Sequence, residues 1–180
     1  TALLSIAASL ALFAATRAPA ETVTPLRAAD VRSGIAINTH VNYLDTAYAK
    51  PAEVVKALRY IGVDEVREQT PTPWNSGSAP LDTYAYMAGQ GIHFDFIALG
   101  GEADFGKTIS QAAALNTRVP GMVTALEGFN EIDNNHNFDW FGQKGAAGGV
   151  ASQKALFAAA NKAAPLKDVF IYDLTGAEVM

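Results

Sequence analysis

The segment between residues 124 and 140 carries the side chains best suited to chemistry. It reads TALEGFNEIDNNHNFDW, so an apolar run ends at Leu126 and is followed by carboxylates, amides and a histidine among aromatic residues. A carboxylic acid such as Glu131 can give or take a proton, and the adjacent amide of Asn130 can hydrogen-bond a hydroxyl group. The segment therefore predicts an acid/base site where a buried strand opens into a polar pocket.

The elements that position these residues alternate along the chain. Gly62 ends a helix that begins at Pro51, and the glycines at 145–149 predict a flexible loop. Strands separated by helices at intervals of about 30 residues are repeated βα units, which predict a parallel sheet covered by helices. Apolar runs predict strands at 34–39, 63–68, 93–99, 121–126 and 169–172, and helical spacing of apolar residues predicts helices at 51–61, 81–90, 107–115 and 152–164.

Two α/β architectures fit these repeated units. One is an open doubly wound parallel sheet, complete at five strands. The other is a (β/α)8 TIM barrel of about 250 residues, of which residues 21–180 are the first five units, so that the domain is truncated. A barrel collects polar side chains from several strand ends, as this sequence does, whereas an open sheet often has a glycine-rich turn after its first strand. That turn, NTHVNYLD, has no glycine, so the pattern favours the barrel.

The composition and the first residues indicate an exported globular domain. The 180 residues are 49% hydrophobic with a formal net charge of −5, and no basic cluster offers a surface for nucleic acid or for a membrane. An apolar block at residues 2–15 precedes Ala18-Pro19-Ala20, which fits signal-peptide cleavage before Glu21. We therefore expect a signal peptide at 1–20 and a secreted or periplasmic domain. Cysteine is absent, which excludes cysteine nucleophiles and cysteine zinc sites.

The residues after the fourth predicted strand resemble the acid/base motif of clan A glycoside hydrolases, a group of retaining (β/α)8-barrel enzymes. Gly128, Asn130, Glu131 and Asp133 reproduce a Gly-x-Asn-Glu-x-Asp arrangement found in that clan. The resemblance implies an O-glycosyl hydrolase in which Glu131 is the general acid/base. It also implies that the nucleophile is a glutamate on a seventh strand, outside this chain, so that the fragment alone is inactive.

The same resemblance implies an oligo- or polysaccharide substrate and no cofactor. Arg67 is placed like the arginine that supports the nucleophile in the clan, and Asn130 can hydrogen-bond a sugar hydroxyl. Flat aromatic rings, Tyr43 and Phe129 among them, are candidates for stacking on sugar rings. The residues expected to bind substrate are Asn130, Arg67, His40, Asn38, Trp74 and Trp140.

Several of these residues also have plain structural interpretations. Glu127 is the competing acid, but without a preceding asparagine it is expected to form a buried hydrogen-bonded or ion pair near the barrel mouth. Arg67 could simply pair with Glu65 or Glu68. Tryptophans are more often packed in a core or loop than used as sugar platforms.

Two other functions fit the same pattern. The first is a non-catalytic carbohydrate-binding barrel that keeps the cleft without the chemistry. The second is a metal-assisted barrel hydrolase that uses His40, His93 and Asp133. The loop at 133–139 imitates the start of a calcium loop, but Phe138 and Lys144 stand where an EF-hand needs glycine and glutamate. An irregular calcium site in that loop is left open, and so are the sugar, the linkage and the oligomeric state.

Overall fold

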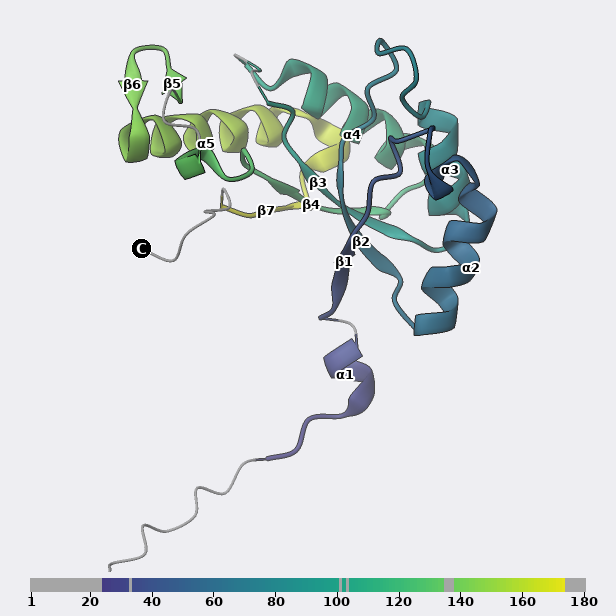
Figure 1. Cartoon of the computed structure of the whole chain (residues 1–180). Coiled ribbons are helices and arrows are strands. Elements are labelled where there is room, and N and C mark those ends of the chain that lie inside the picture. The colour runs from purple at the N-terminus through teal and green to yellow at the C-terminus, as the bar shows by residue number, and fades with distance from the viewer. Residues whose placement is uncertain (1–23, 33, 101, 103, 135–137, 174–180) are drawn as a thin grey trace, which may run out of the picture.

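A computed structural model describes residues 24–32, 34–100, 102, 104–134 and 138–173. The predicted signal peptide at 1–20 lies outside the described residues. The fold is α/β, with a five-stranded parallel sheet that alternates with helices (Figure 1). The strands are β1 (Ala36–Asn38), β2 (Glu65–Gln69), β3 (His93–Ile97), β4 (Val123–Glu127) and β7 (Phe170–Ile171), and the main helices are α2 (Pro51–Ile61), α3 (Leu81–Gly89), α4 (Gly106–Arg118) and α5 (Gly145–Lys162).

Helix α2 shows how local sequence sets these elements. Pro51 occupies its first turn, where the missing N–H is not needed, and Gly62 ends it with a φ of 77°, a conformation that glycine adopts without strain. Val55 and Leu58 lie on its buried side, three residues apart, which is the spacing of one helix face. The predicted bounds of this helix are confirmed.

The sheet has the strand order β1-β2-β3-β4-β7, and every neighbouring pair is parallel. Each strand therefore pairs with the next strand of the sheet along the chain. The register places Arg67 opposite both Asn38 and Asp95, and Ile97 opposite Glu127. Because the strands are parallel, their carboxyl ends and the loops that follow them meet at one edge of the sheet.

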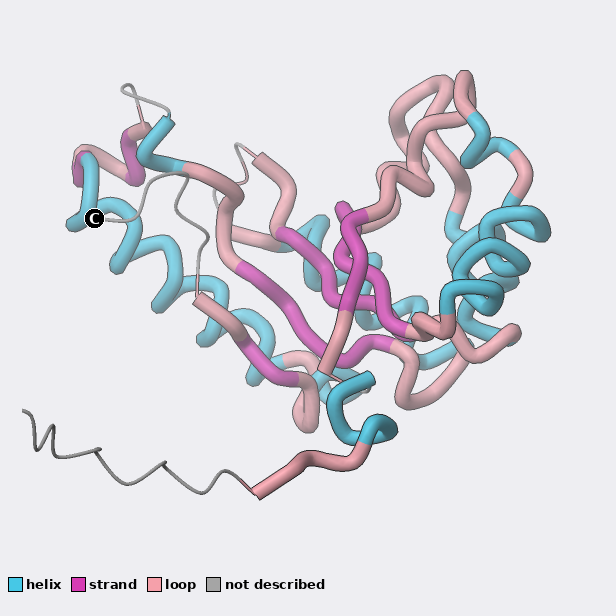
Figure 2. Tube along the Cα trace, turned by 60° about the horizontal axis from the view of Figure 1, so that its bottom comes forward, coloured by secondary structure: helices cyan, strands magenta, loops and turns pink. Residues whose placement is uncertain are grey.

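The two faces of the sheet differ in what covers them. Val66, Phe94, Phe96 and Leu126 point to one face, where they form a core with side chains of α2, α3, α4 and α5. Figure 2 shows these helices along one side of the curved sheet. Arg67, Asp95 and Glu127 alternate with those apolar residues and point to the opposite face, which we call the open face because no described helix covers it.

The segment before α5 differs from the prediction. The glycines at 145–149 form the first turns of α5 instead of a flexible loop. A Cβ on Gly148 would lie 2.3 Å from the carbonyl oxygen of Gln143, so glycine here permits a close approach of the backbone. That approach packs α5 against a hairpin that was not predicted, formed by β5 (Asp139–Trp140) and β6 (Gln143–Lys144).

At the N-terminal end of the described chain, helix α1 (Ala28–Arg32) buries none of its residues and extends away from the sheet in Figure 1. Among the described residues, no helix combines the length and the apolar character that crossing a membrane requires.

Candidate functional site

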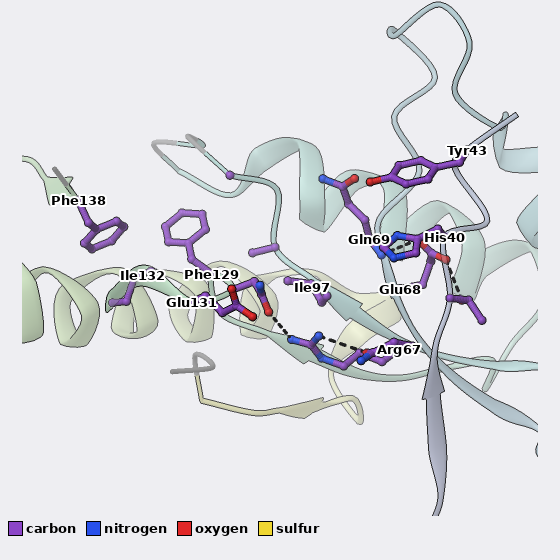
Figure 3. Close-up of a pocket in the computed structure, with 15 residues that line it drawn as sticks. His40, Tyr43, Arg67, Glu68, Gln69, Ile97, Phe129, Glu131, Ile132 and Phe138 are labelled. Carbon is purple, nitrogen blue, oxygen red and sulfur yellow. Dashed lines mark hydrogen bonds between the residues drawn. The ribbon is translucent and has the colours of Figure 1, made fainter. Parts of the chain in front are cut away.

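A cleft of about 470 Å³ lies at the carboxyl edge of the sheet (Figure 3). Side chains from the ends of β1, β2, β3 and β4 and from the loops after them line it. Five predicted site residues meet in this cleft: Asn38, His40, Arg67, Asn130 and Glu131.

Arg67 lies at the centre of the polar side of the cleft. Its Nε donates to Oε1 and Oε2 of Glu127 at 2.9 and 2.8 Å, and its Nη2 donates to Oε2 at 2.6 Å. The same Nη2 donates to Oδ1 of Asn130 at 3.0 Å, and Nη1 donates to Oδ1 of Asn38 at 3.3 Å. One guanidinium group thus ties together the ends of β1, β2 and β4.

The structure shows which carboxylate pairs with Arg67. Arg67 pairs with Glu127, sixty residues further along, and not with Glu65 or Glu68. Glu65 instead accepts a hydrogen bond from the hydroxyl of Thr124 at 2.8 Å. The expectation that Glu127 forms a buried ion pair is confirmed, and contact with Glu127 raises the pKa of Arg67.

A second carboxyl group touches this ion pair. Asp95, on the open face of β3, is 6% exposed and is hydrogen-bonded to Glu127, which is itself 9% exposed. Burial and the nearby charge of Glu127 raise the pKa of Asp95 to about 8, whereas Arg67 acts in the opposite direction. Asp95 therefore holds its proton more tightly than an ordinary aspartate, next to the ion pair of Arg67 and Glu127.

Glu131 stands in the loop after β4, next to this cluster. Its φ of 50° is left-handed, a conformation uncommon for a residue with a side chain and frequent at functional positions. The carboxylate is exposed in the cleft and accepts one described hydrogen bond, from Nδ2 of Asn134 at 3.1 Å. It can therefore reach a bound molecule, as an acid/base residue must.

Asn130 is oriented by Arg67. Since its Oδ1 accepts from Nη2 of Arg67, its Nδ2 donor points elsewhere and the exposed side chain can offer that donor to a ligand. Asn38 is held in the same way on the other side of Arg67. The cleft thus presents two amide donors and one carboxylate at one site.

Glu68, which the sequence analysis considered only as a partner of Arg67, organises the first loop of the cleft. It is 1% exposed, and its carboxylate accepts from Thr39 Oγ1 at 2.8 Å, from the backbone N of Val41 at 2.6 Å and from its neighbour Gln69 at 2.9 Å. Burial raises its pKa to about 7, and the three donors oppose that shift. Glu68 fixes the backbone from which His40 projects.

The loop after β1 forms one wall of the cleft. The ring of His40 stacks on that of Tyr43 with centroids 4.7 Å apart, and Gln69 accepts from Nδ2 of Asn42 at 2.9 Å. Figure 3 shows His40, Tyr43 and Gln69 at one end of the cleft, and Phe129, Ile132 and Phe138 at the other. A ligand in the cleft would contact polar groups at one end and apolar groups at the other.

The two tryptophans have different surroundings. Trp74 is 44% exposed and lies in a depression beside the cleft, and Gln69 and Gly100 line both hollows. The ammonium of Lys107 lies 4.8 Å from the centroid of the Trp74 ring. The prediction for Trp140 is corrected by its packing: its buried ring contacts Phe105 and Phe129, at 5.2 and 5.6 Å between centroids, so its faces are not available to a sugar.

The described part of the chain contains no cluster of side chains that would support the metal-assisted hydrolase. Among the side chains that the structure describes, no three histidine, aspartate or glutamate side chains lie close enough to hold a metal ion. The side chain of Asp133, which belongs to this alternative, lies outside them. His40 follows the carboxyl end of β1, whereas His93 begins β3 at the opposite edge of the sheet. The imitation of a calcium loop spans residues 135–137, which lie outside the described residues.

Comparisons of this chain with protein-family models, with curated proteins and with solved structures found no match.

Sequence reasoning missed some residues that build the site. No role in the site was assigned to Asp95, and Glu68 was considered only as one possible partner of Arg67. The signal that could have found them is strand alternation: an acidic residue inside an apolar strand must face a partner, because a buried unpaired carboxylate is costly. Identifying the partner needs the register between strands, which the sequence does not provide.

Proposed function

We propose that the chain is the N-terminal part of an exported glycoside hydrolase of clan A type, a retaining (β/α)8-barrel enzyme with Glu131 as its acid/base. The observation that carries this proposal is the arrangement of Glu131 and Asn130 beside Arg67 in one cleft at the carboxyl edge of the sheet. Active sites of α/β barrels are built from several strand ends at that edge. The substrate is an oligo- or polysaccharide.

The order of the strands supports the barrel. In a doubly wound sheet the strand order reverses at a switch point and helices cover both faces. In the described part of this chain each strand of the sheet pairs with the next, and α2–α5 pack on one face. Parallel sheets are normally buried on both faces, so the polar open face fits the inside of a barrel that three further strands would close.

The proposed chemistry is that of retaining glycosidases. In the first step a carboxylate attacks the anomeric carbon while Glu131 gives its proton to the departing glycosidic oxygen. In the second step Glu131 takes a proton from water, whose oxygen replaces the enzyme carboxylate at the same carbon. Asn130 donates from Nδ2 to a sugar hydroxyl. The nucleophile is a glutamate outside this chain, and Arg67 has the role of keeping that glutamate ionised through charge-assisted hydrogen bonds.

The neighbouring depression supports a substrate of several sugar units. The exposed ring of Trp74 offers a flat apolar surface, and Gln69 and Gly100 join this depression to the cleft around Glu131. A second sugar ring can stack on Trp74 while the scissile bond lies beside Glu131. His40 and Asn38 bind the sugar on the other side of Arg67.

Replacement of Glu131 by Gln in the full-length protein tests the proposal. We expect turnover of an unactivated glycoside to fall by roughly 10²- to 10⁴-fold with folding unchanged, because general acid help is worth about that much. A glycoside with an acidic leaving group needs less protonation and should lose less. Glu53→Gln, on the exposed face of α2, is the matched control and should leave both rates unchanged.

The results also separate the proposal from its rivals. Turnover of Glu131→Gln within about tenfold of the parent on the unactivated glycoside would refute the acid/base role. A full-length parent that binds glycans without cleaving them would indicate a carbohydrate-binding barrel. Activity that a chelator abolishes and a divalent ion restores would indicate a metal-assisted hydrolase.

A further inference from the structure

Asp95 is a buried acid that the proposed reaction does not use. It lies in the middle of β3, opposite Arg67 on β2 and Ala125 on β4, and points to the open face. Its side chain is hydrogen-bonded to Glu127, and its Oδ1 has no hydrogen-bond partner among the described residues. Two carboxyl groups can share a hydrogen bond only if one of them carries the proton.

The contacts of the two acids identify which one carries the proton. Glu127 accepts three hydrogen bonds from Arg67, and charge-assisted bonds of this kind favour the ionised form. No described side chain donates a charge-assisted bond of this kind to Asp95. An ionised Asp95 would be a buried carboxylate with one oxygen unpartnered and the other beside a second carboxylate, which is strongly unfavourable.

We propose that Asp95 is a positioning residue of the cleft, which as a neutral acid donates a hydrogen bond to Glu127 and thereby holds Arg67 against Asn130. The chain of contacts runs from Asp95 to Glu127, from Glu127 to Arg67, and from Nη2 of Arg67 to Oδ1 of Asn130, the residue that precedes Glu131. The effect on turnover rests on the proposed function, whereas the proton on Asp95 and its link to Arg67 do not.

The surroundings of Asp95 give the arrangement a pH dependence. The charged groups that act on Asp95 are Glu127 on β4 and Arg67 and Glu65 on β2. When Asp95 loses its proton, the donor to Glu127 disappears and a second negative charge competes for Arg67. Since the pKa of Asp95 is raised to about 8, the contact between Arg67 and Asn130 should weaken above that pH.

Asp95→Asn tests whether the site needs a hydrogen-bond donor at this position or a negative charge. Its amide has nearly the same shape and can donate to Glu127 at every pH, whereas Asp95→Ala removes the donor. In the full-length enzyme, we expect kcat/KM of the parent to decline above about pH 8, where Asp95 loses its proton. We expect kcat/KM of Asp95→Asn to stay within about threefold of the parent near neutral pH and to show no such decline at alkaline pH. Asp95→Ala should lose roughly 10- to 100-fold, because small displacements of reacting groups cost about that much.

Two outcomes of the activity measurement would overturn the proposal. The first is that Asp95→Asn, shown to be folded by circular dichroism, loses as much activity as Asp95→Ala, which would mean that a carboxylate is required. The second is that Asp95→Asn keeps the alkaline decline of the parent, which would place the titrating group elsewhere.

A second measurement needs no activity, so it distinguishes failure of this inference from failure of the proposed function. We would follow the carboxyl carbon of Asp95 and the side-chain N–H signals of Arg67 by NMR as a function of pH. We expect both to change with one apparent pKa near 8 in the parent, and the Arg67 signals to stay constant over that range in Asp95→Asn. Arg67 signals that ignore the titration of Asp95 would overturn the inference even in an active enzyme.

Discussion

The face of the sheet that packs against α2–α5 is almost wholly apolar, whereas the open face carries Arg67, Asp95 and Glu127. Phe94 and Phe96 on the first face stack on each other, with 5.2 Å between their ring centroids. Apolar rings of this kind can pack against many different apolar neighbours. On the open face each group needs one particular partner. Hydrophobic packing is non-directional, so the first face should set stability, and the second should set the geometry of the site.

The largest effect should follow from a change on the helix-covered face. Phe96→Ala removes a fully buried ring, so we expect a loss of about 3–5 kcal/mol in the free energy of unfolding, measured by denaturant titration. Phe170→Ala is the matched control, since Phe170 is 68% exposed and makes its ring contact with Tyr172 alone among the described rings. Its loss should stay below about 1 kcal/mol. Equal losses would contradict the proposed division between the faces.

An intermediate effect should follow on the open face, where Arg67 and Glu127 are mostly buried. Arg67→Met leaves Glu127 without its counter-ion, which should cost about 2–3 kcal/mol, a value reduced because both side chains keep some exposure to water. The double variant Arg67→Met/Glu127→Leu removes both charges and should cost less than Arg67→Met alone. Unfolding titrations of the two single variants and the double variant measure this coupling. A double variant with additive losses would show that the pair contributes little.

The helix-covered face could be predicted from the sequence because its signals are local. The spacing of Val55 and Leu58, and Gly62 at the end of the helix, mark α2 without reference to the rest of the chain. The five strands were located by short apolar runs between helices. These local signals also predicted the α/β class and the parallel sheet, and the structure confirms both.

The open face could be predicted only in part, since its contacts depend on register. The residues near Glu131 were identified from their positions after strands, but the partner of Arg67 was not, because Glu127 becomes its neighbour only across β3. The burial of Trp140 could not be predicted, because it depends on packing against Phe105, which lies far away along the chain. The glycines of α5 were misjudged because the close approach of Gln143 to Gly148 is a tertiary contact.

Glu68 is an exception on the helix-covered face, because it is a carboxyl group at the end of that face of β2. Its pKa is raised to about 7 by burial, so the folded protein binds this proton more tightly than the unfolded chain, for which the ordinary value is 4.5. The stability contributed by this proton is fully present below about pH 4.5 and is lost as the pH rises through about 7. Stability should therefore fall across that window, by at most about 1.4 kcal/mol per pH unit for one proton.

The measurement is the free energy of unfolding of the parent, Glu68→Gln and Asp95→Asn between pH 4.5 and 9. Asp95 also binds its proton more tightly in the folded state, so its contribution continues until about pH 8. Glu68→Gln should reduce the decline between about pH 4.5 and 7, whereas Asp95→Asn should reduce it over the whole range up to about pH 8, including the part above pH 7. The glutamine leaves one donor of the 39–41 loop or Gln69 without an acceptor, so it also costs about 1–2 kcal/mol at every pH. The prediction concerns the slope of the free energy of unfolding against pH, and not that constant loss. If Glu68→Gln left this slope unchanged, Glu68 would be ionised in the folded protein, because its three hydrogen-bond donors outweigh its burial.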